Sequence, residues 1–76
     1  MNTLDTLVVE LNNLTDGGYT IEETPWEEIA LHYDGRYLRR RSQETEEERL
    51  TDMIAFVKYY KEKNVSVEKI VNNLNV

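Results

Sequence analysis

The chain has no cysteine, and its 76 residues include only one proline, one histidine and three glycines. Without cysteine it can form neither a disulfide nor a thiolate metal cluster, so its stability has to come from buried apolar side chains. Because His32 is the only histidine, a site with several histidine ligands is excluded. The absence of cysteine fits a reducing compartment. We therefore expect a cytoplasmic protein that holds no metal and no other cofactor.

Long hydrophobic runs are also missing. The longest run, Met53 to Val57, stops at Lys58, whereas a membrane-spanning helix needs about 20 apolar residues. The first residues include Asp5 and Glu10 and lack a basic stretch before an apolar run, so they do not have the pattern of a secretion signal. We expect residues 1–76 to form one domain that makes no contact with a membrane.

Side chains for catalysis are scarce as well. A nucleophile–base pair would need His32 beside Ser42 or Ser66, the only serines. Both serines are better explained as boundary or capping residues. The acidic run from Glu44 to Glu48 lacks the Asp and Gly spacing of a calcium loop, and we interpret it as the solvated start of a helix. The sequence therefore predicts a protein that is not an enzyme.

Helical periodicity is present at both ends of the chain. Apolar residues recur at steps of three and four over Thr3–Leu14, Glu46–Lys63 and Ser66–Leu74. Thr45 and Glu48 make a capping box in front of the second of these segments. Each segment has a start signal and one apolar stripe, which predicts three amphipathic helices.

Short connections separate the predicted helices. Asp16-Gly17-Gly18 ends the first helix, because glycine enters the left-handed region at low cost. Tyr19–Glu23 alternates in polarity and would allow a brief extended piece, but no partner strand is obvious. Asn64 is a suitable residue to stop the long helix before Ser66.

The middle of the chain also has helix signals. Thr24 can act as an N-cap with Pro25 at the first helical position, and Glu27 completes a capping box. The apolar stripe that follows consists of Trp26, Ile29, Ala30 and Tyr33. These signals predict a helix over Thr24–Tyr33 that ends at Asp34-Gly35.

A second interpretation of Asp34-Gly35 is the two-residue turn of a β-hairpin between residues 29–33 and 36–40. We favour the helix because the capping box and the stripe agree, and we expect a further short helix over Arg36–Ser42 with Tyr37, Leu38 and Arg41 facing inward. The predicted fold is then all-α, a compact bundle of about five short helices.

Charge is distributed unevenly along the chain. The net charge is −6, which opposes non-specific binding to a polyanion. Four of the nine basic residues nevertheless lie within six positions, and four glutamates follow directly. These residues are Arg36, Arg39, Arg40 and Arg41, then Glu44, Glu46, Glu47 and Glu48. The two groups make a local charge dipole inside an acidic chain.

The letters W-E-E-I-A at residues 26–30, G at 35 and L-R-R-R at 38–41 form one further pattern. It resembles the helix-turn-helix DNA-binding domains of phage and bacterial proteins. The resemblance implies that Ala30 is the small residue where two helices cross, that Gly35 is the turn, and that the recognition helix opens at Arg36. It also implies that Arg36, Arg39, Arg40 and Arg41 bind duplex DNA through phosphates and guanine edges.

A partial match of the same kind covers residues 64–76, where Asn75 stands at the usual position of the turn glycine. If it is the start of a second motif, the chain is a piece of a longer protein. The simpler interpretation, which we favour, is an ordinary last helix that closes the core.

A different class of function is also compatible with the sequence. The arginine run can be an exposed face neutralised by Glu44–Glu48. A small acidic helical body then suits a protein-interaction module that binds a basic protein surface, such as a phage or host regulatory or inhibitor protein. The arginines of one copy could also pair with the glutamates of another, which would give a homodimer.

Overall fold

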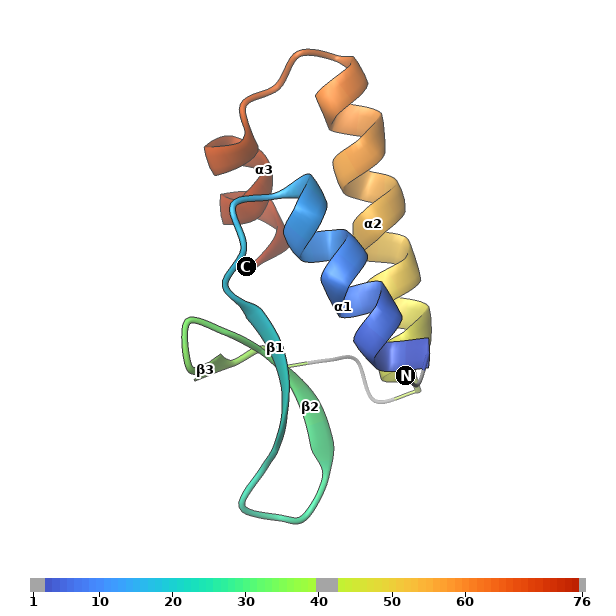
Figure 1. The fold of residues 1–76 in the computed structure, drawn as a ribbon, viewed down its shortest axis with the longest axis vertical. Helices are drawn as coiled ribbons and strands as arrows, with labels where there is room; N and C mark the ends of the chain where they lie inside the picture. Colours follow the sequence, from blue (N-terminus) through green and yellow to red (C-terminus); the bar gives the residue numbers. More distant parts are fainter. Residues whose placement is uncertain (1–2, 40–42, 76) are drawn as a thin grey trace.

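The computed structural model describes residues 3–39 and 43–75. Within these ranges it has three helices and one three-stranded antiparallel sheet (Figure 1). The elements are α1 (Thr3–Leu14), β1 (Tyr19–Glu23), β2 (Ile29–Tyr33), β3 (Arg36–Tyr37), α2 (Glu46–Glu62) and α3 (Val67–Leu74). The prediction of an all-α bundle of five helices is therefore wrong, and the fold is α+β.

The three helices predicted at the ends of the chain are confirmed. Thr45 and Glu48 form the expected capping box at the start of α2, where the Thr45 hydroxyl accepts from the Glu48 N–H at 3.1 Å. Ser66 caps α3 by accepting from the Lys69 N–H. Asn64 ends α2 in the left-handed region, with φ of 63°. These signals act within a few residues, so the sequence is sufficient to locate them.

The helix predicted over Thr24–Tyr33 is wrong because its start signal serves a turn. The Glu27 N–H donates to the Thr24 carbonyl at 3.0 Å, and the Thr24 hydroxyl accepts from the N–H groups of Trp26 and Glu28. A proline with φ near −65° suits the second position of such a turn as well as the first position of a helix. Residues 24–28 therefore form the loop of a hairpin between β1 and β2.

Asp34-Gly35 is the two-residue hairpin turn that was the less favoured interpretation. Both residues have positive φ, 49° and 79°, as a type I′ turn requires. Tyr33 pairs with Arg36 and His32 with Tyr37 across this turn. The helix predicted over Arg36–Ser42 is thus wrong for residues 36–39, and residues 40–42 lie outside the described part of the chain.

The sheet has the order β1-β2-β3, and its register alternates side chains between two faces. Tyr19 and Leu31 lie on the face toward the helices, where both are buried. The amide of Asn12 in α1 clamps the backbone of Tyr19, accepting from its N–H at 3.0 Å and donating to its carbonyl at 2.8 Å. This clamp joins α1 to the first residue of the sheet.

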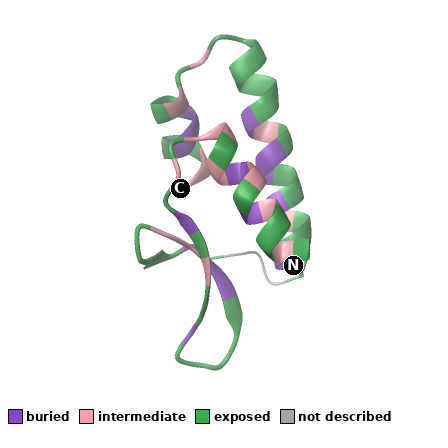
Figure 2. Cartoon of the chain, viewed as in Figure 1, coloured by how far each residue is buried: buried purple, intermediate pink, exposed green. Residues whose placement is uncertain are grey.

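The core lies between the helices and the near end of the sheet (Figure 2). Its largest fully buried side chains are Tyr19, Leu11, Leu31, Leu50, Ile70 and Val57. Burial of each such aliphatic side chain contributes about 1.5–3 kcal/mol. The far end of the β1–β2 hairpin extends away from the helices, and its loop is exposed apart from Thr24 (Figures 1 and 2). We call residues 19–33, which comprise β1, the loop and β2, the hairpin arm.

Candidate functional site

The four arginines predicted to bind DNA do not share a helix in the described structure. Arg36 is in β3 and faces the end of α3, where it lines a cavity with Val71 and Asn75. Arg39 follows β3 and lines an open groove on the other face of the sheet. Arg40 and Arg41 lie outside the described residues. Arg36 and Arg39 therefore lie at different sites, on opposite faces of the sheet, rather than forming one cationic ridge.

Negative charge, in contrast, is concentrated on the hairpin arm and its two ends. Residues 16–35 contain six acidic residues and no lysine or arginine, while the remaining nine acidic residues of the chain balance its nine basic residues. The six are Asp16, Glu22, Glu23, Glu27, Glu28 and Asp34. The four glutamates among them are all exposed. This segment thus accounts for the entire net charge of −6.

Exposed apolar side chains occupy the same arm. Trp26 is 73% exposed in the loop, and Ile29 is 56% exposed at the start of β2. Trp26 stands in the turn that the Thr24 hydroxyl holds, and Ile29 faces the helix side of the sheet but lies near the loop end, where it is not covered. The sequence prediction placed both residues in the core stripe of a helix. The structure instead exposes both residues, Trp26 in the loop and Ile29 at the start of β2, in the same segment as the exposed glutamates.

The sheet face turned away from the helices has an open groove of about 620 Å³, lined by Trp26, Glu28, Tyr37 and Arg39. Tyr37 is 39% exposed and lies against the ring of His32, with ring centroids 5.8 Å apart. The groove therefore has two aromatic walls, one carboxylate and one guanidinium. Such a lining offers flat apolar contact together with fixed polar partners.

Protein-family models, curated proteins and solved structures were compared with the chain. No match was found in any of the three. In the part of the chain that the structure describes, no helix combines the length and the apolar character needed to cross a bilayer.

The sequence analysis singled out the arginines but did not identify Trp26 and Ile29 as exposed apolar residues. Trp26 and Ile29 fit an i, i+3 helical step, and this step hides the fact that they belong to a loop and a strand. The signal that identifies them is the pair of turns, Thr24-Pro25-Trp26-Glu27 and Asp34-Gly35, on either side of a five-residue strand. Arg49 was also missed: it donates to the Leu38 carbonyl at 2.7 Å and thereby fastens the segment after β3 to α2.

Proposed function

We propose that the chain is a protein-interaction module whose hairpin arm binds a basic protein with an apolar pocket. The observation that supports this proposal is the coincidence of exposed Trp26 and Ile29 with four exposed glutamates in one projecting hairpin. An isolated exposed apolar residue is common on protein surfaces. An exposed tryptophan and an exposed isoleucine in one projecting hairpin, among four glutamates, have the composition of a protein-binding surface.

The two kinds of side chain have different roles in such a complex. Trp26 and Ile29 would supply most of the affinity, because large apolar side chains that enter a dry pocket are typical hot spots. Glu22, Glu23 and Glu28 would attract a basic partner and speed its association, an effect that salt weakens. The partner is therefore expected to present lysine or arginine residues around an apolar depression.

DNA binding by Arg36, Arg39, Arg40 and Arg41 stays a prediction that needs its own assay. Its supposed recognition helix is not formed over residues 36–39, and the acidic arm precedes these arginines directly. Negative charge next to the arginines lowers the gain from phosphate contacts. We therefore expect no retardation of duplex DNA at about 50 mM salt. Retardation that Arg36→Ala with Arg39→Ala removes would favour DNA binding over a protein partner.

A peptide library selected against the immobilised protein tests the proposal without knowledge of the partner. We expect the enriched peptides to be basic and to contain a large apolar residue. Trp26 is the only tryptophan, so its emission should shift to shorter wavelength when such a peptide covers it. Affinity measured with labelled peptides should fall at least tenfold in Trp26→Ala, a loss of about 1.4 kcal/mol.

Matched controls separate the arm from other surfaces. Tyr59→Ala removes another exposed aromatic side chain, 54% exposed against 73% for Trp26, from α2, and the affinity of this variant should equal that of the wild type. Glu22→Gln with Glu28→Gln should slow association and flatten its salt dependence. Enrichment of acidic or uncharged peptides, or unchanged affinity in Trp26→Ala, would refute the proposal.

A further inference from the structure

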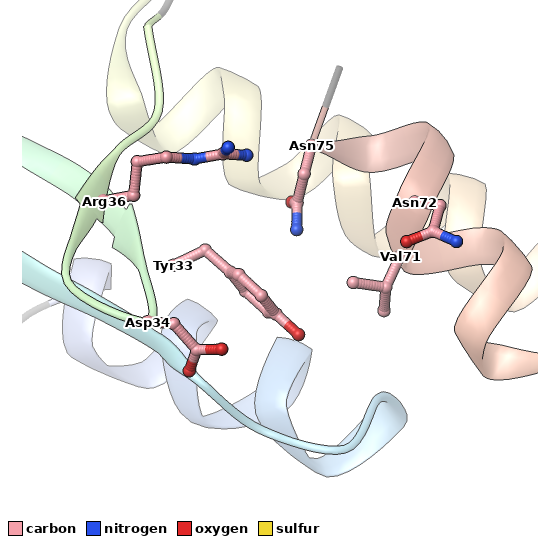
Figure 3. Close-up of a pocket in the computed structure, with 6 residues that line it drawn as sticks. All are labelled: Tyr33, Asp34, Arg36, Val71, Asn72 and Asn75. Carbon is pink, nitrogen blue, oxygen red and sulfur yellow. The ribbon is translucent and has the colours of Figure 1, made fainter.

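A second concave site lies on the helix side of the sheet, away from the groove of the hairpin arm. It is a cavity of about 510 Å³ between the β2–β3 turn and the last turns of α3. Its lining residues are Tyr33, Asp34, Arg36, Val71, Asn72 and Asn75 (Figure 3). Two segments far apart in the sequence thus contribute to one cavity.

Two opposite charges line this cavity without neutralising each other. Asp34 and Arg36 are two residues apart on the same turn, yet no ion pair within 4.0 Å joins them, and neither side chain has a partner in residues 3–39 and 43–75. Figure 3 shows the ring of Tyr33 between the two side chains. A carboxylate and a guanidinium held apart in one cavity leave room for a ligand that carries both complementary charges.

Hydrogen-bond donors gather at the Arg36 end. The buried Tyr19 hydroxyl donates to the Oδ1 atom of Asn75 at 2.8 Å, which fixes the orientation of that amide. The Nδ2 group of Asn75 is then left to donate, and Figure 3 shows Asn75 close to the guanidinium end of Arg36. An amide and a guanidinium side by side are suited to a carboxylate, which accepts from several donors.

The middle of the cavity is apolar. Val71 is buried at 7% exposure and forms one wall, and the ring of Tyr33 forms another. The Tyr33 ring is held by an edge-to-face contact with Tyr19, with centroids 4.8 Å apart. A ligand that spans from Asp34 to Arg36 would therefore pass a short hydrocarbon surface that is fixed by the core.

We propose that this cavity binds a small zwitterion of the amino-acid class. Arg36 and Asn75 take its carboxylate, Asp34 takes its ammonium group, and Tyr33 with Val71 contact the carbon atoms between them. The site is distinct from the groove that Arg39 lines, because Arg36 and Arg39 face opposite sides of the sheet. Binding here does not depend on a protein partner at the hairpin arm.

Amide chemical shifts of the full chain can be followed by NMR during titration at constant ionic strength. The probes are alanine, ε-aminocaproate, acetate and ethylammonium. Alanine carries its ammonium and carboxylate groups on the same carbon atom, whereas ε-aminocaproate separates them by a chain of methylene groups, so these two probes identify the spacing that the cavity accepts. We expect one of the two to shift the resonances of Tyr33, Arg36 and Asn75, and to bind at least tenfold more tightly than acetate or ethylammonium.

Three variants complete the test. Arg36→Gln and Asp34→Asn should each weaken binding of the preferred zwitterion at least tenfold, and Arg39→Gln should leave it unchanged. Asp34→Asn keeps the turn, because asparagine tolerates the positive φ of 49° at this position. Acetate binding as tightly as both zwitterions, full zwitterion affinity in Asp34→Asn, or no shifts at these residues would each overturn the proposal. Loss of peptide binding at the hairpin arm would leave it standing.

Discussion

At the scale of single residues, Glu27 occupies a conformation that its side chain disfavours. Its φ is 62°, in the left-handed region, at the fourth position of the loop between β1 and β2. A residue with a Cβ atom is strained there, whereas glycine is not. Glu27→Gly should therefore raise the free energy of unfolding by about 0.5–1 kcal/mol, measured by urea denaturation. A decrease would show that the Glu27 side chain makes contacts that outweigh the strain.

Tyr19 links stability to alkaline pH. Burial, with a smaller effect of nearby Tyr33, raises the pKa of Tyr19 from 10.0 to about 12. Between these values the unfolded chain loses the hydroxyl proton and the folded chain keeps it, so the stabilising contribution is complete below pH 10 and is lost as pH rises toward 12. The free energy of unfolding should fall over this range, as followed by urea denaturation.

The control for this pH effect is Tyr19→Phe. This variant removes the ionisable hydroxyl and its hydrogen bond to Asn75, which should cost about 1 kcal/mol at neutral pH. Its stability should decline less steeply between pH 10 and 12 than that of the wild type. An equal decline of stability with pH in the two proteins would mean that other ionisable groups cause the loss of stability at alkaline pH.

At the scale of elements, β2 is a strand within the segment for which the sequence predicted a helix. Leu31 is fully buried and Ile29 is 56% exposed, the reverse of what the predicted helical stripe requires. Leu31→Ala should destabilise the protein by about 2–5 kcal/mol, and Ile29→Ala by less than about 1 kcal/mol. Thermal and urea unfolding followed by circular dichroism measure both. A larger loss of stability in Ile29→Ala than in Leu31→Ala would contradict the burial pattern of the strand.

At the scale of the whole molecule, the charge of the arm opposes folding. Six acidic residues within residues 16–35 repel one another without a lysine or arginine in the same segment. Salt screens such repulsion, so raising the ionic strength from about 0.01 M to 1 M should stabilise the chain. Replacing Glu22, Glu23, Glu27 and Glu28 together by glutamine should stabilise it by about 0.5–1 kcal/mol at low salt.

The screening effect has an internal control. The quadruple glutamine variant should gain less from added salt than the wild type does, because fewer like charges remain to be screened. Circular dichroism during urea denaturation at the two ionic strengths measures both proteins. An equal gain would mean that salt acts on the fold as a whole, through ion exclusion from its surface, rather than on the arm.

How much of the fold can be predicted from the sequence depends on the distance along the chain over which each signal acts. The caps at Thr45 and Ser66 and the stripe of Thr3–Leu14 involve neighbours within one or two turns, so the three helices follow from the sequence. Thr24-Pro25-Trp26-Glu27 satisfies the same backbone donors in a turn as in a helix start. Local hydrogen bonding alone therefore left two structures open for the middle of the chain.

Tertiary contacts decide between those two structures. Only the strand brings Leu31 and Leu38 into the core beside Tyr19, and only the sheet gives β1 a partner. The candidate sites follow from the same choice, because the turn at Asp34-Gly35 sends Arg36 to α3 and Arg39 to the groove. By itself the sequence determined the three helices nearest the chain ends, the net charge and the turns at Asp16-Gly17-Gly18, Asp34-Gly35 and Asn64. The burial of residues that are distant in sequence determined which side chains around those turns are exposed and which are buried.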